Sequence, residues 1–209
     1  MEMIKRMIFC TLFIAGLLLN TYGQIRKNTS SNILPRIQND AMRISFAKVG
    51  TVTQLDDSTY SVALSSSGIL SSKAVVEIST TSRLFVNLPG SNGGRLYLDS
   101  SEAARLFKNR IGLDTVNTGQ MNFHRAYWAV YAGMGMWDCV INCHVQQNGK
   151  YYIVSLVQEK QFGKPGEIVN GKTITTKELQ SKALLALRDT TSNVVSEFNK
   201  LLSTVQIYK

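Results

Sequence analysis

The sequence is poor in the residues that carry most enzyme chemistry. Of its 209 residues, two are His, three are Cys and three are Pro. Serine is common, but no Gly-x-Ser-x-Gly nucleophile motif occurs, and the carboxylates form no paired motif. The composition therefore favours a binding or accessory protein over an enzyme, and it indicates no cofactor.

Long hydrophobic runs are also scarce, and the main one stands at the N-terminus. Lys5 and Arg6 precede an apolar run over 7–19, and small or polar residues lead to Gln24. Thirteen residues are fewer than the roughly 20 that a membrane-spanning helix needs. We therefore predict a cleaved signal peptide over 1–23 and a secreted or periplasmic, bacterial protein, with a short membrane anchor as the alternative. No transmembrane segment is expected after cleavage.

Positively charged residues outnumber negatively charged ones, but they are not clustered. The formal net charge is +9, and loss of Glu2, Lys5 and Arg6 with the signal peptide leaves +8. The basic residues are scattered, with no run of five or six and no nucleic-acid motif. A solvated basic surface is the favoured interpretation, and the expected partner is another envelope protein or an anionic surface. Nothing in the pattern specifies an oligomeric state.

The remaining chain has the length of one domain. Residues 24–40 are polar and predict a flexible leader, and residues 41–209 predict a single α+β domain. Turn chemistry at 55–58 predicts a hairpin within 42–66, and β-rich runs follow at 73–78, 82–88 and 95–98. The Asn-Gly pairs at 148–149 and 170–171 predict two further hairpins, because type I′ turns need positive φ at both central residues.

The longest periodic segment is C-terminal. Apolar residues over 175–205 recur at helical spacing, and Thr175 with Glu178 forms a capping box at the start. Five poor helix formers at 189–193 are able to end one helix and begin another, but the apolar stripe keeps its phase across them. We therefore predict one long helix, with room for a bend there. A shorter helix is predicted over 101–111, so that the α+β fold is an antiparallel sheet packed against one long helix.

Aromatic and basic residues alternate in the middle of the chain. The run 123–131 predicts a strand, after which Gly133 and Gly135 break the pattern. Side chains of this kind can stack on bases or sugars, or can be buried as core under a helix. The candidate binding residues are Arg125, Tyr127, Trp128, Tyr131 and Trp137.

A second, alternative function rests on Cys139, Cys143 and His144. Thiolate and imidazole ligands suit copper or zinc, and two thiols suit redox chemistry. If this segment is a strand, however, the two cysteines lie about 13 Å apart on one face and His144 points to the other. Buried core cysteines are the competing interpretation.

Overall fold

A computed structural model describes residues 34–64, 74–87, 94–98 and 112–208. The chain divides into two units, Met1–Leu34 and Pro35–Lys209, and every element described below belongs to the second. The predicted signal peptide at 1–23 and the predicted short helix at 101–111 lie outside the described residues.

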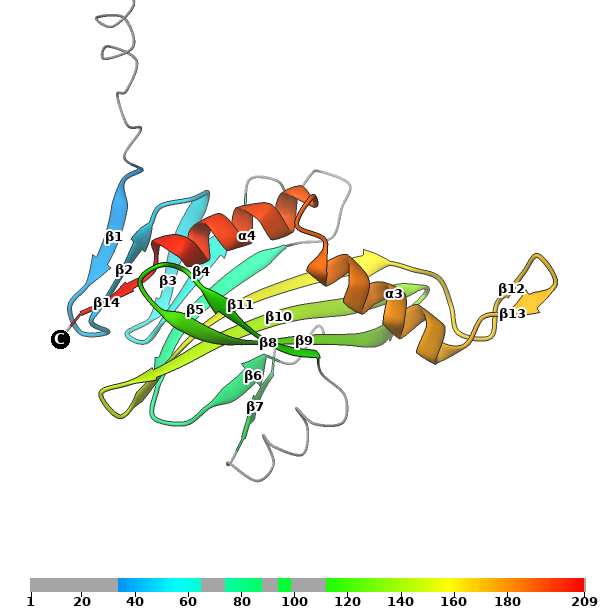
Figure 1. Ribbon diagram of the computed structural model, residues 1–209, viewed down its shortest axis with the longest axis horizontal. Helices are drawn as coiled ribbons and strands as arrows, with labels where there is room; N and C mark the ends of the chain where they lie inside the picture. Colours follow the sequence, from blue (N-terminus) through cyan, green and yellow to red (C-terminus); the bar gives the residue numbers. More distant parts are fainter. Residues whose placement is uncertain (1–33, 65–73, 88–93, 99–111, 209) are drawn as a thin grey trace, which may run out of the picture. The chain divides into compact units, whose positions relative to one another are not determined.

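The central element is an antiparallel sheet, to which seven strands of the described residues belong (Figure 1). The three longest, of 12 residues each, lie next to one another as β9, β10 and β11. The order across the sheet is β3 (Thr51–Asp56), β4 (Thr59–Ala63), β5 (Val75–Thr81), β11 (Lys150–Gln161), β10 (Met136–Gln147), β9 (Asn122–Gly133) and β8 (Gly112–Asn117). The antiparallel sheet of the predicted α+β fold is therefore present.

Local turn chemistry determines which strands become hairpins. Asn148 and Gly149 both have positive φ, +53° and +73°, and join β10 to β11 as predicted. Asn170 and Gly171 do the same for β12 (Ile168–Val169) and β13 (Lys172–Thr173). The Asp56 carboxylate accepts hydrogen bonds from the backbone N–H and hydroxyl of Ser58 at 2.7 and 2.8 Å. This contact closes the β3–β4 turn, which confirms the turn predicted at 55–58.

A separate three-stranded sheet is formed by segments from both ends of the described chain. β2 (Ile44–Ala47) lies between β1 (Arg36–Asn39) and β14 (Gln206–Ile207). The hairpin predicted within 42–66 does not include β2, because β4 pairs with β3 and β2 pairs with β1. Residues 36–39 fall inside the predicted leader, yet they pair with β2 in a regular antiparallel register.

The C-terminal segment forms two helices, which corrects the prediction of one long helix. α3 runs over Thr176–Arg188 and α4 over Asn193–Thr204. Asp189 accepts hydrogen bonds from the backbone N–H and hydroxyl of Thr191 at 2.9 and 2.6 Å, so the chain closes a local turn in place of another helical turn. The capping box of Thr175 and Glu178 is confirmed. Neither helix of the described residues has the length and hydropathy required to cross a membrane.

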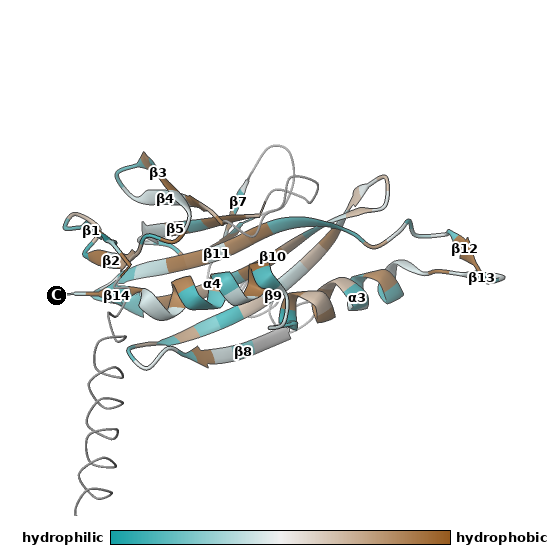
Figure 2. Cartoon of the chain, turned by 90° about the horizontal axis from the view of Figure 1, so that it is seen from above, coloured by the Kyte–Doolittle hydropathy of each residue, from teal (hydrophilic) through white to brown (hydrophobic). Residues whose placement is uncertain are grey.

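Both helices bury their apolar sides against the sheets. α3 contacts β9 and β10, and α4 contacts β2 (Figure 1). Alternating hydrophilic and hydrophobic bands mark both helices and the long strands (Figure 2), in keeping with one buried and one solvated side. Helical residues of this core are Leu179, Ala183, Leu187, Val195, Phe198, Leu201 and Leu202.

The opposite face of the main sheet is covered by a short hairpin, β6 (Phe85–Asn87) and β7 (Arg95–Tyr97). Phe85 packs with Ile153 of β11, and Val86 packs with Leu98 beside Trp128 of β9. The middle strands are consequently buried on both faces, and β10 is buried without interruption from Trp137 to Cys143.

We expect Phe198→Ala to destabilise the domain by about 3–5 kcal/mol, because the fully buried ring is removed from the interface of α4 with the sheets. Lys200→Ala, at an exposed position of the same helix, should change stability by less than about 0.5 kcal/mol. Urea unfolding followed by circular dichroism measures both. Equal effects of the two substitutions would contradict this packing.

Candidate functional site

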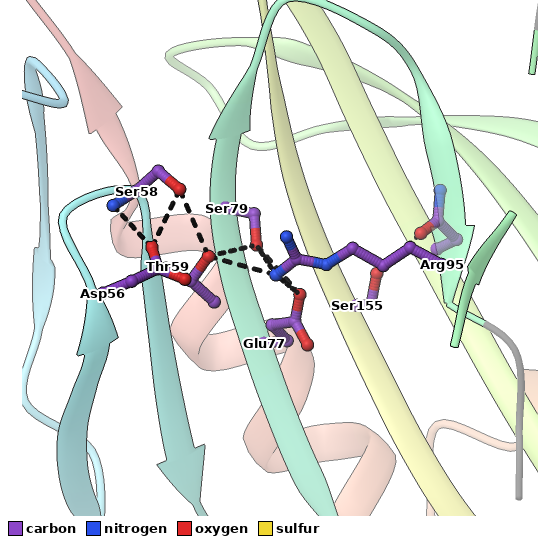
Figure 3. A network of polar contacts seen from close by, with 8 residues as sticks. Asp56, Ser58, Thr59, Glu77, Ser79, Arg95 and Ser155 are labelled. Atoms are coloured by element: carbon purple, nitrogen blue, oxygen red, sulfur yellow. Dashed lines mark hydrogen bonds and ion pairs between the residues drawn. The ribbon is translucent and has the colours of Figure 1, made fainter. Parts of the chain in front are cut away.

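A network of polar contacts lies on the sheet face opposite the helices (Figure 3). One guanidinium nitrogen of Arg95, from β7, donates to Glu77 at 2.6 Å, Thr59 at 3.0 Å and Ser79 at 3.3 Å. Ser79 also donates to Glu77 at 2.9 Å, and the guanidinium lies 4.6 Å from the ring centroid of Phe85. Since these contacts join β7 to β4 and β5, the cluster fastens the covering hairpin to the sheet.

A second buried polar pair continues this row across the sheet. Ser155 stands opposite Glu77 in the register and donates to the amide oxygen of Asn142 at 2.6 Å. The amide nitrogens of Asn142 and Asn87 have no hydrogen-bond partner within the described part of the chain. The row holds hydroxyls, amides and one ion pair, which is an arrangement suited to positioning strands.

The candidate binding residues from the sequence do not share one surface. Arg125 forms a two-pronged ion pair with Asp114 at 2.7 and 2.8 Å, and the Tyr127 hydroxyl donates to the same carboxylate at 3.0 Å. The hydrogen bonds from Arg125 lower the pKa of Asp114. Burial raises the pKa of Tyr127 to about 12. Tyr127 is therefore a core residue, and Trp128 lies on the opposite face of the sheet.

Tyr131 and Trp137 have a positioning role at one end of the sheet. Their ring centroids are 5.5 Å apart on the helix-covered face. The Trp137 indole donates to the carbonyl of Gly163 at 3.1 Å, and the Tyr131 hydroxyl accepts from the backbone N–H of Gly135 at 3.4 Å. The two rings thus hold the β9–β10 turn and the segment after β11 in place.

An open pocket of about 500 Å³ lies between these two held segments. The backbone N–H groups of Phe162 and Gly163 donate to the carbonyl of Gly135 at 3.1 and 3.2 Å, which brings the segments together. Gly163 has φ +107°, a conformation that side chains rarely permit. The lining residues are Met134, Gly135, Gln161, Gly163, Lys164, Pro165, Gly166 and Glu167.

The β12–β13 hairpin begins at the rim of this pocket and projects beyond the long strands (Figure 1). Every residue over 166–173 is exposed, including Ile168 at 70% and Val169 at 44%. Four of the eight exposed large apolar side chains of the described residues lie at this end: Val130, Met134, Ile168 and Val169. We call the β9–β10 turn, residues 161–167 and the β12–β13 hairpin the hairpin end.

The projecting hairpin is tied to α3 by charge. The Lys172 ammonium donates to Glu178 at 2.6 Å, and Glu178 also accepts from the backbone N–H of Thr175 at 2.8 Å. These hydrogen bonds, with that to Lys172 the largest cause, lower the pKa of Glu178 to about 2. The capping box therefore stabilises the start of α3 and also fixes the base of the hairpin.

The predicted metal cluster of Cys139, Cys143 and His144 is not brought together. Both cysteines are free and buried in the core beneath the helices, whereas His144 follows Cys143 in an extended strand and points to the other face. No group of three His, Cys, Asp or Glu residues able to hold a metal ion occurs in the described ranges. Burial raises the pKa of both thiols, that of Cys139 to about 12.

Sequence reasoning missed the hairpin end as a site, although one signal was available. The second Asn-Gly turn is flanked by Ile168 and Val169 on one side and by Lys172 on the other. Two-residue strands around a turn cannot bury much apolar surface. Apolar residues in such a short hairpin are therefore more informative than the aromatic strand, whose rings are used in the core.

No protein-family model matches the sequence. No curated protein matches it either. A crystal structure from Bacteroides thetaiotaomicron VPI-5482 is similar over 85% of this chain, at 11% identity and a TM-score of 0.44, and the chain spans about half, 49%, of that structure's length. The solution structure of cyanobacterial PsbP (CyanoP) from Synechocystis sp. PCC 6803 is similar over 87% of this chain and 96% of its own, at 10% identity and a TM-score of 0.28. TM-scores below 0.5 do not establish a shared family.

We expect the charge of Glu178 to stabilise the fold in a pH-dependent way. Because its folded pKa is lowered from 4.5 to about 2, the stabilisation is present above pH 4.5 and is lost as the pH falls toward 2. Glu178→Gln keeps a capping side chain but removes the charge. The urea midpoints of wild type and variant should differ above pH 4.5 and converge near pH 2; a constant difference would contradict the assignment.

We also expect Cys139 and Cys143 to be unreactive in the folded protein, because a thiol with a raised pKa has little thiolate at pH 8. A form beginning at Gln24, which lacks Cys10, should react with Ellman's reagent only on addition of denaturant. Fast labelling of two thiols in buffer would show that the core placement is wrong.

Proposed function

We propose that the protein is an exported, non-catalytic accessory protein that binds an acidic surface of another cell-envelope protein through its hairpin end. The observation that carries this proposal is the exposure of Ile168 and Val169 on a hairpin that projects from the fold. An isolated two-stranded hairpin is marginally stable in water and gains nothing from exposed β-branched side chains. Burial against a partner would supply the apolar contact that the fold itself does not.

The rigid base beneath the hairpin supports this interpretation. Trp137, Tyr131 and the paired backbone of Gly135 and Gly163 hold the pocket segments, and Glu178 holds Lys172. A presented hairpin that is already ordered loses less conformational entropy on binding than a mobile loop does. The pocket of about 500 Å³ beside it is large enough to receive a side chain of the partner.

The charge of the chain determines the expected partner chemistry. The formal net charge without residues 1–23 is +8, and the segment 159–178 carries Lys160, Lys164, Lys172 and Lys177 against Glu159, Glu167 and Glu178, of which Glu178 pairs with Lys172. Lysines near exposed apolar side chains complement an apolar patch with acidic residues around it, and positive charge raises the rate of association with such a patch. An anionic lipid surface shares this charge complementarity and is distinguished experimentally below.

The contacts of the ionisable groups on the sheet favour binding over catalysis. Asp114 is occupied by Arg125 and Tyr127, Glu77 is occupied by Arg95 and Ser79, and the two thiols are buried with raised pKa values. A catalytic nucleophile needs a base within hydrogen-bond reach and access to substrate. The ion pairs of Asp114 and Glu77 instead connect strands to one another.

We expect the double substitution Ile168→Asp and Val169→Asp to weaken capture of the partner at least about ten-fold, because truncation of central apolar anchors costs most of the binding energy of an interface. The tagged protein beginning at Gln24 is incubated with a detergent extract of the cell envelope, and retained proteins are quantified at low and high salt. A photoreactive phenylalanine analogue in place of Val169 identifies the direct contact.

Leu55→Asp is the matched control, since Leu55 is 59% exposed on the edge strand β3, outside the hairpin end. It should leave capture unchanged, and an analogue at position 55 should not cross-link to the same protein. Both variants should keep the wild-type unfolding midpoint. Equal capture by all three proteins would refute the hairpin end as the interface, and binding to anionic lipid vesicles with no cross-linked protein would replace the protein partner with a membrane surface.

A further inference from the structure

The two histidines of the described chain stand side by side on the sheet. His144 of β10 is paired directly with His124 of β9 in the antiparallel register. Their ring centroids are 5.4 Å apart, and the ring planes are inclined by 31°. His124 is exposed and His144 half-buried, so the pair is accessible from solvent. The sequence separates them by 20 positions, and only strand pairing brings them together.

The separation of the rings matches that of two imidazoles bound to one metal ion. A metal–nitrogen bond of about 2.0–2.1 Å with tetrahedral angles places the centroids of two ligating rings about 5 Å apart. Directly opposed side chains in an antiparallel pair have Cβ atoms about 4.5–5.5 Å apart, which allows both rings to reach the same ion. The two strands are also rigid, since β9 and β10 pair along their length.

The donor set at this place consists of imidazoles. The thiols do not compete for an ion at this place, because Cys143 points into the core on the other face.

We propose that His124 and His144 form a two-imidazole site for a divalent transition metal ion, with water completing the coordination. Borderline ions that prefer imidazole suit this donor set, and the expected order of affinity places Cu²⁺ above Zn²⁺. The ring of Tyr151 lies 6.4 Å from that of His144 and forms one wall of the site, and Thr115 stands opposite His124 on β8. The site is separate from the hairpin end and does not depend on the function proposed for it.

The test is isothermal titration of the protein beginning at Gln24 with Cu²⁺ and with Zn²⁺ at pH 7.5. Wild type should bind one ion, and His124→Asn should weaken binding at least ten-fold, because a chelate loses most of its affinity when either ligand is removed. His144→Asn should do the same, and the double variant should lose more affinity than either single variant but less than the sum of the two losses, because the chelate contribution is lost only once. Saturating metal should raise the unfolding midpoint of the wild type alone.

Each other outcome overturns the site. If wild type binds two ions and each single variant binds one, each histidine binds its own ion and the two do not share a site. Binding that survives in the double variant at wild-type affinity would place the metal elsewhere, such as at the amino terminus. Absence of binding would show that the rings are packed as an ordinary cross-strand pair. If His144→Asn fails to fold, the exposed position of His124 still decides the question.

Discussion

Burial of β10 and β11 on both faces is the constraint on which the rest of the structure depends. Successive residues of a strand point to opposite sides, so Cys139 and Ile141 need one cover and Val140 needs another. The helices α3 and α4 cover the first side, and the β6–β7 hairpin lies on the second. These covers come from distant parts of the chain, residues 85–97 and 176–204.

The second face is stabilised differently from the first. Beneath the helices the contacts are almost entirely apolar, whereas beneath β6–β7 the apolar contacts of Phe85 are joined by the hydrogen bonds of Arg95. A half-buried ion pair with several acceptors gains less free energy than apolar burial, but it specifies where the covering hairpin lies. The polar row from Glu77 to Asn142 is therefore better explained as orientation of the hairpin than as a reactive centre.

At the hairpin end, the residues that hold the structure together differ from the residues that are exposed. Tyr131 and Trp137, which the sequence suggested for binding, act one layer below the surface by holding the pocket segments. Ile168 and Val169 are exposed apolar groups at this end, together with Val130 and Met134. Aromatic content alone predicted the strand correctly but not the surface, because a ring on a covered face and a ring on an open face have the same sequence pattern.

Local chemistry could be predicted from the sequence, since the interacting groups lie within a few residues of each other. The two Asn-Gly turns, the turn of Asp56 and Ser58, and the capping box of Thr175 and Glu178 are of this kind. The poor helix formers after Arg188 indicated a possible end of the helix, but the apolar residues kept their helical spacing across them, and this favoured one helix. In the structure the helix ends there, because the Asp189 side chain accepts a hydrogen bond from the backbone of Thr191. Pairings of β2 with β14 and of His124 with His144 needed the tertiary structure. Many registers satisfy the same period-two pattern, and only the packing of the whole domain selects one.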